Sequence, residues 1–420
     1  MPAVLPALLR RLAGPKQRRR SLYESTRGES LEPRVLPAAV VAASKATLNI
    51  TGDAEASDLQ IEQITGGVKV TALNGTQLTV GGNLVTEATF SGITGLNVRL
   101  GEGDDSVAVL GSLNLKNVTF NLGDGNNVLD VGAGMNVTGK LAITGGTGAD
   151  QITLDSTIAK SVSISTGLGN DELNLLGVSF SSSVSVSTGA GADIININEN
   201  ALGADALLNN NLTISTGEDN DTVSISNTTT KKVTINTGDD DDVVTLDTVT
   251  ATGILNVQTG AGADDLNLLD VNATLNGSNV FNLGTGADDV VIAESSFKGN
   301  VTIDLGTGIV NTLKIDDTAF LAAFNLNANG GVNLGGIGDV INIETDTSLL
   351  GSTTFTKAVK MKVGAAADIN FGVLNVASDT DFLSSVAISG INPAADLTVA
   401  LANNTFFSLP NLSKVTRLDI

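Results

Sequence analysis

Acidic side chains recur along this chain at one kind of turn, in which Gly-x-Gly is followed by one residue and then by aspartate. Such turns expose backbone carbonyl oxygens beside a carboxylate. Calcium accepts several carboxylate and carbonyl oxygens in flexible geometry, so the residue types suit calcium binding. The turns end at Asp105, Asn127, Asp150, Asp171, Asp193, Asp221, Asp242, Asp264 and Asp288.

A second interpretation of the same position needs no metal. Aspartate side chains often accept hydrogen bonds from backbone N–H groups of a turn, and asparagine serves equally well. Asn127 and Asn311 stand where the other turns have aspartate. The residues alone leave both interpretations open.

The turns are positioned by a repeated unit of about 22 residues, a period typical of stacked supersecondary units. In one copy Val162 and Ile164 alternate with serines, which predicts a strand with one buried face. Gly167 and Gly169 then permit a sharp corner. Leu173 begins a second alternating segment.

Apolar residues recur at constant offsets from each turn, which favours an all-β, single-stranded parallel β-solenoid (β-helix) of about 22 residues per coil. The units are too short for helical crossovers. We expect Leu173, Ile195 and Val223 to stack as one internal column and the turn aspartates to form an outer acidic ridge. An antiparallel sandwich is the alternative fold. Further acids thicken the ridge at Asp104, Asp124, Asp219, Asp239, Asp240, Asp241, Asp265 and Asp289, and corner threonines placed to bond between coils are Thr166, Thr188, Thr216, Thr237 and Thr259.

The chain divides into four predicted parts. Residues 1–45 form a basic export or targeting segment, 46–95 an N-terminal cap, 96–316 the regular coils, and 317–420 degenerate C-terminal coils. In the cap, Asn74-Gly75 between apolar segments signals a hairpin. An insertion at 199–210 is expected to be a loop that bulges from one coil.

Charge is unevenly distributed along the chain. The net charge is −22, yet residues 1–45 hold nine basic and three acidic residues. The acidic remainder disfavours nucleic acid and anionic membranes as partners, because like charges repel. No apolar run is long enough to predict a transmembrane helix.

Composition also limits the chemistry. The absence of Cys and His excludes disulfides, thiolate metal sites and the commonest general base. There is no Trp and the single tyrosine is Tyr23, so no aromatic sugar-stacking site is expected. Right-handed β-helices include polysaccharide lyases and hydrolases, which we keep as the alternative function. Because the coils stay regular and basic residues are scarce in the central array, we expect no enzyme and assign no catalytic residue.

The N-terminal segment carries an Arg-rich run followed by Leu-Glu-Pro-Arg-Val-Leu at residues 31–36. This stretch resembles the Leu-Glu-Pro-Arg-x-Leu-Leu motif at the N-termini of large repetitive surface and secreted proteins of planctomycetes and related bacteria. Pro37 replaces the second Leu of that motif. The resemblance implies export, with processing near residues 42–44.

The turns resemble the RTX nonapeptide Gly-Gly-x-Gly-x-Asp-x-apolar-x, which binds calcium in a parallel β-roll. Residues 145–152 match it fully, whereas here the motif occurs once per coil rather than in tandem. The resemblance implies Ca²⁺ as cofactor and these side-chain ligands: Asp105, Asp150, Asp171, Asp193, Asp221, Asp242, Asp264 and Asp288.

These observations together predict a secreted or cell-surface repeat protein that acts as a structural rod or an adhesin-like display scaffold, with calcium as a candidate stabiliser. The expected partner is a protein or matrix ligand that the sequence does not identify.

Overall fold

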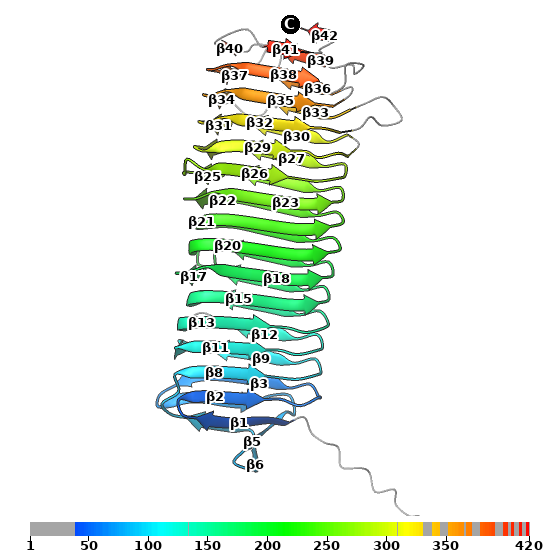
Figure 1. Cartoon of the computed structure of the whole chain (residues 1–420). Coiled ribbons are helices and arrows are strands. Elements are labelled where there is room, and N and C mark those ends of the chain that lie inside the picture. Colours follow the sequence, from blue (N-terminus) through cyan, green and yellow to red (C-terminus); the bar gives the residue numbers. More distant parts are fainter. Residues whose placement is uncertain are drawn as a thin grey trace, which may run out of the picture. The chain divides into compact units, whose positions relative to one another are not determined.

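The computed structural model describes residues 38–132, 134–308, 310–330, 338–344, 352–364, 367–371, 379–390, 398–401, 405–406, 411–413 and 417–419. Contacts divide the chain into residues 1–35 and 36–420, and the description that follows concerns the second unit. It is all-β and forms a parallel β-solenoid of about 12 turns with a spacing of roughly 23 residues, which confirms the predicted fold class (Figure 1). Among the described residues, no helix is long and apolar enough to cross a bilayer.

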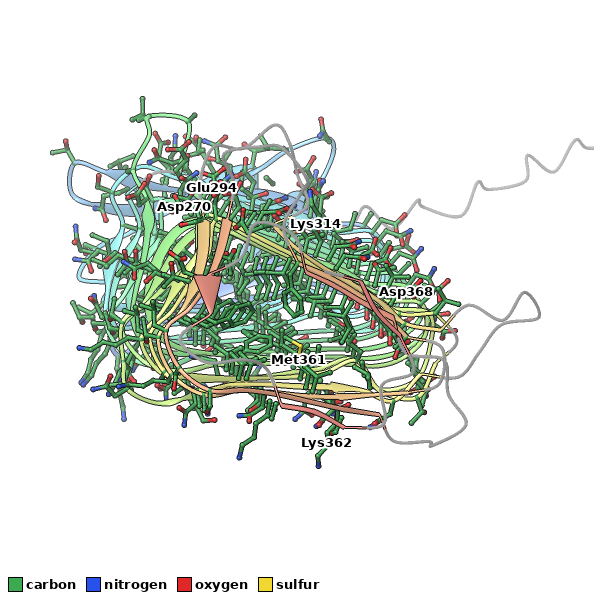
Figure 2. All side chains as sticks on the ribbon, turned by 90° about the horizontal axis from the view of Figure 1, so that it is seen from above. Asp270, Glu294, Lys314, Met361, Lys362 and Asp368 are labelled. Atoms are coloured by element: carbon green, nitrogen blue, oxygen red, sulfur yellow. The ribbon has the colours of Figure 1, made fainter. Side chains whose placement is uncertain are left out.

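Each coil has three sides, and every side is a parallel sheet that runs along the stack (Figures 1 and 2). The first side contains β2 (Thr47–Thr51), β8 (Gly95–Arg99), β11 (Asn117–Asn121), the end of β13 (Asn136–Thr144), most of β15 (Ile158–Leu168), β18 (Val184–Ala190), most of β20 (Ala206–Glu218), the end of β21 (Thr222–Asp239), β23 (Leu255–Ala261), β26 (Ser278–Asn282), β29 (Asn300–Asp304), β32 (Phe324–Ala328), β35 (Val359–Val363), β38 (Val386–Gly390) and β41 (Asn411–Ser413).

The second side follows the glycine turns. It contains β3 (Asp58–Ile64), β9 (Ser106–Leu110), β12 (Val128–Val131), β14 (Gln151–Asp155), β16 (Glu172–Leu176), β19 (Ile194–Asn198), the start of β21, the start of β22 (Val243–Ala251), β24 (Asp265–Leu269), β27 (Asp289–Ala293), β30 (Thr312–Asp316), β33 (Val340–Ile343), β36 (Asp368–Phe371), β39 (Thr398–Leu401) and β42 (Arg417–Asp419).

The third side is the shortest and closes each coil. It contains β10 (Asn114–Leu115), the starts of β13, β15 and β20, β17 (Ser179–Phe180), the middle of β21, the end of β22, β25 (Asn272–Ala273), β28 (Ser296–Phe297), β31 (Ala319–Phe320), β34 (Ser352–Phe355), β37 (Asp379–Phe382) and β40 (Thr405–Phe406).

The predicted internal columns are confirmed. Leu173 pairs in register with Ile195, and Ile195 pairs with Val223. All three side chains are fully buried, because alternate residues of a strand point to the same face of its sheet. Stacking equivalent residues from successive coils therefore builds one continuous apolar core.

Phenylalanines form a further column on the third side near the C-terminal end. Phe297, Phe320, Phe355 and Phe382 stack with centroid separations of 5.5, 4.9 and 5.1 Å and nearly parallel rings. Stacked aromatic pairs add to the energy of burial. This column continues the core through the part of the chain where the repeat pattern is weakest.

The N-terminal end is covered by strands that interrupt the parallel order. β1 (Ala38–Ser44) is antiparallel to β2, and β4 (Gly67–Ala72) is antiparallel to β3 and to β7 (Glu87–Phe90). β5 (Gln77–Val80) pairs with β1 and with β6 (Asn83–Val85). The turn at Asn74-Gly75 forms, but the predicted hairpin is wrong because β4 and β5 each pair with other strands and not with each other.

Two other expectations can be placed on the structure. Residues 42–44, where processing is expected, lie in β1 and pair there with β2. Only part of the 199–210 insertion is a loop, because β20 begins at Ala206 and joins the third side through its pairing with β17.

Candidate functional site

The candidate site is the glycine corner, which we define as the corner between the first and second sides where the Gly-x-Gly-x-Asp turns lie. Gly189 and Gly191 have φ angles of +112° and +124°. A Cβ on Gly189 would come within 1.6 Å of the Gly167 carbonyl oxygen, and one on Gly191 within 2.2 Å of the Gly169 oxygen. Both glycines are thus required, because each coil lies directly against the backbone of the preceding coil.

The eight aspartates predicted as ligands do not form an outer ridge. Their exposed fractions are between 0% and 2%, so they line the inside of the glycine corner. The prediction of an outward position was wrong for these residues. The acids that flank them in the turns, such as Asp104, Asp124 and Asp241, are exposed as expected.

Buried aspartates and asparagines form one hydrogen-bonded chain, which we call the aspartate column. The backbone N–H of Asp171 donates to Oδ1 of Asp193 at 2.8 Å, and the N–H of Asp193 donates to Oδ1 of Asp221 at 2.8 Å. Each carboxyl thus accepts a bond from the equivalent residue one coil earlier. The same link joins, in order, Ser57, Asp105, Asn127, Asp150, Asp171, Asp193, Asp221, Asp242, Asp264, Asp288, Asn311 and Asp339.

These links satisfy backbone donors that the sheets leave over. A buried N–H without an acceptor is costly, and at this corner the acceptor is a side chain rather than a neighbouring strand. Asn127 makes the same link as its aspartate neighbours. The structure therefore gives the acids the role of backbone acceptors, between coils rather than within one turn.

The second oxygen of each predicted ligand has a different environment. Oδ2 of all eight aspartates is buried and has no hydrogen-bond partner among the described residues. Asn127 shows what surrounds this position, because its Nδ2 donates to the carbonyl oxygens of Gly123 and Gly125 at 3.2 and 3.1 Å. An aspartate places an oxygen where Asn127 has this nitrogen. Two acceptors then face each other unless a proton or a cation lies between them.

Burial favours the protonated form of these carboxyl groups. Loss of hydration disfavours the charged carboxylate, and the hydrogen bonds from backbone N–H groups oppose that effect only in part. Burial raises the pKa of Asp171 and Asp264. It raises the pKa to about 7 for Asp105, Asp221 and Asp288, and to about 6 for Asp150, Asp193 and Asp242.

Four of the five predicted corner threonines bond between coils beside the carboxyl groups, whereas the buried hydroxyl of Thr188 has no hydrogen-bond partner among the described residues. The hydroxyl groups of Thr166, Thr216, Thr237 and Thr259 donate to a carbonyl oxygen of the next coil at 3.0 to 3.2 Å. A hydroxyl that donates its only hydrogen in this way can still accept one. A protonated aspartate next to such a threonine would therefore find an acceptor within its own turn.

A metal centre was the main chemical expectation for this corner. The aspartates lie one per coil, and no three acidic side chains converge among the described residues in a way that could hold an ion. The structure thus brings the eight predicted ligands into one column but not into one cluster. Calcium binding at the glycine corner stays a prediction.

Sequence reasoning missed a second feature, at the corner between the third and first sides. A groove of about 590 Å³ lies there, and its lining includes Lys298, Lys357 and Leu321. No described carboxylate lines it. The signal in the sequence was the recurrence of lysine just after the third-side strands, which becomes visible only once those short strands are located.

Comparison of the chain with protein-family models, with curated proteins and with solved structures gave no match.

Proposed function

We propose that this chain is an exported extracellular or cell-surface rod that serves as a structural element or an adhesin-like display scaffold. The observation that carries the proposal is the continuous register of the three sides. Parallel pairing joins coil to coil from β8 to β42, and the same residue types occupy the same positions (Figure 1). Such an array is long and stiff and presents the same surface many times, which suits a protein that spaces or displays other groups.

Export rests on the N-terminal segment. Its Arg-rich run and the Leu-Glu-Pro-Arg stretch at residues 31–34 resemble the ends of exported repeat proteins. The test is fractionation of the native host that expresses the full chain, a Glu32→Ala/Arg34→Ala variant, or a chain without residues 1–35. We expect the full chain in the extracellular or surface fraction and both variants inside the cell. Full chain retained in the cytoplasm would contradict export.

Calcium belongs to this proposal as a candidate stabiliser of the glycine corner. Its support is the unpartnered Oδ2 of the eight aspartates, at a position that Asn127 fills with a donor to two glycine carbonyls. A cation and a proton are alternative ways to separate these oxygens. A cation at this position requires ionised carboxylates, whereas a proton makes them neutral. The two are therefore distinguished by comparing the effect of calcium on stability at different pH values.

A polysaccharide lyase or hydrolase remains the alternative function, because the same fold suits such enzymes. No specific observation favours it over the rod. The groove lined by Lys298 and Lys357 contains no described carboxylate for acid–base chemistry.

A further inference from the structure

Lysines gather at one corner of an otherwise acidic solenoid. We call the corner between the third and first sides the lysine corner. Its lysines occupy the few residues between a third-side strand and the next first-side strand, and all are exposed except the half-buried Lys232. They are Lys116, Lys140, Lys160, Lys231, Lys232, Lys298 and Lys357.

These lysines have no opposite charge nearby. The described residues of the lysine corner include no aspartate or glutamate. The ion pairs found in the described part of the chain, Lys69 with Glu62 and Lys314 with Asp316, lie elsewhere. The corner is therefore a row of lysines that make no ion pair within the described part of the chain.

The glycine corner has the opposite charge. Its exposed acids include Glu102, Asp104, Asp124, Glu218, Asp219, Asp239, Asp240, Asp241, Asp265 and Asp289. The chain runs from the lysine corner along a first-side strand to the glycine corner. The first side, which carries Lys362 in Figure 2, is thus bounded by a basic corner at one end and an acidic corner at the other.

The two corners run alongside each other on the stack, where successive coils are about 4.8 Å apart. From Lys116 to Lys357 the lysines recur at intervals of one to three coils, and the exposed acids of the glycine corner likewise occur in some coils and not in others. A partner for the lysine corner needs carboxylates arranged along a line, and a second copy of this chain supplies such a line at its glycine corner. A groove lies beside Lys298 and Lys357, so these two lysines border a recess in the surface rather than a flat face.

We propose that the lysine corner of one copy docks along the glycine corner of a second copy, so that copies associate side by side. This inference rests on the proposed function as a structural rod. The contact uses different surfaces on the two partners, so it leaves a free lysine corner and a free glycine corner and can be repeated. The net charge of −22 opposes approach at long range, while the facing corners attract at contact, where screening by salt is weakest.

The test is sedimentation velocity of the full chain at about 0.1 M salt, where the Debye length is about 10 Å, and at about 1 M, where it is about 3 Å. We expect faster-sedimenting species at the lower salt and their loss at the higher. A Lys231→Glu/Lys298→Glu/Lys357→Glu variant should sediment as a single slow species at both. The matched control, Lys45→Glu/Lys360→Glu/Lys362→Glu, makes the same charge change away from the corner and should associate like the wild type.

The decisive experiment reverses charges on the glycine corner and then mixes the two variants. A Glu218→Lys/Asp239→Lys/Asp265→Lys variant removes acids from the glycine corner and should also fail to associate alone. Mixed in equal amounts, it and the lysine-corner variant should form a complex again, because each supplies the charge that the other lacks. Circular dichroism and the Tm of each variant show that it is folded.

Three results would overturn the inference: a wild type that stays monomeric at the lower salt, a lysine-corner variant that associates like the wild type, or a mixture that forms no complex. A monomeric wild type that instead binds polygalacturonate through its lysine corner would assign that corner to a polyanion. None of these results bears on export, which the fractionation experiment scores separately.

Discussion

The backbone N–H of Asp171 donates to the Oδ1 atom of Asp193 at 2.8 Å, across the boundary between two coils. The side chain that was expected to bind a metal from outside is thus a bridge inside the stack. The same bridge is made by asparagine at Asn127 and Asn311, which carry no charge. Several predictions about stability depend on whether the carboxyl group in this bridge is charged.

Replacing Asp193 by asparagine should stabilise the protein at about pH 8. The amide removes the buried charge and keeps the Oδ1 acceptor, and its nitrogen occupies the position from which Nδ2 of Asn127 donates to two glycine carbonyls, whereas Nδ2 of Asn311 has no partner among the described residues. Asp193→Leu should destabilise by about 1–3 kcal/mol, because it leaves the Asp171 N–H without an acceptor. Urea unfolding of the three proteins measures both effects, and an asparagine variant less stable than the wild type would contradict this account.

Stability of the wild type should fall as the pH rises toward neutrality. Burial raises the pKa of Asp193 to about 6 and of Asp221 to about 7, above the ordinary value of 3.8. The folded state therefore binds protons that the unfolded state has released, so the contribution of protonation is fully present below about pH 3.8, decreases as the pH rises, and is lost above the folded pKa values of about 6 to 7. The Tm should decrease between about pH 5 and pH 7 and level off by about pH 8, and Asp193→Asn should reduce the slope.

Calcium should raise the Tm at about pH 8, where the column is ionised, and have little effect at about pH 5 if the aspartates hold the ion. The comparison is calcium against a chelator, with magnesium as a control for general screening. Magnesium requires stricter octahedral geometry and dehydrates reluctantly. Equal Tm values at pH 8 with calcium and with chelator would remove calcium from the glycine corner.

Adding a methyl group at Gly189 should destabilise the solenoid by more than about 1 kcal/mol, because its φ is +112° and the Cβ would meet the Gly167 oxygen. Gly66→Ala is the matched control, since Gly66 has a φ of +101° with open space around it. The difference between the two variants in urea unfolding isolates the clash between coils from the backbone strain. Equal losses would show that the coils do not lie against each other there.

Shortening a side chain of the internal column should reduce stability far more than shortening the adjacent outward-facing side chain. Ile195 is fully buried between Leu173 and Val223, so Ile195→Ala should lose about 2–5 kcal/mol. The adjacent Ile194 is 43% exposed on the outer face, and Ile194→Ala should change stability by less than about 0.5 kcal/mol. Similar losses from both changes would contradict the register of the second side.

The sequence predicted the sheets well because alternation and a fixed period specify them directly. The same alternation also indicates that the acids point inward. Asp193 lies two residues before the buried Ile195, so its side chain points to the same face. The cost of burying charge favoured an outward position instead. Burial is tolerated here because each carboxyl accepts a bond from a backbone N–H that has no backbone acceptor. The raised pKa values also allow the carboxyl to be neutral.

Other features lay beyond a local pattern. The strands β4 and β5 flank a good turn, yet β4 pairs with the preceding strand β3 and β5 with the following strand β6, and their second partners, β7 and β1, are not specified by the Asn74-Gly75 dipeptide. The lysine corner follows strands as short as Asn272–Ala273 in β25, too brief to show a period. Its lysines become a surface only when the stacking has placed them together.

Every bridge in the aspartate column points the same way, from an earlier N–H to a later carboxyl. During synthesis, each newly added coil therefore completes the one made just before it and presents a fresh unsatisfied donor at the growing tip. The column therefore has a direction that matches that of synthesis, and its two ends are chemically unlike: Ser57 donates at one, and Asp339 receives from Asn311 and Gly330 at the other.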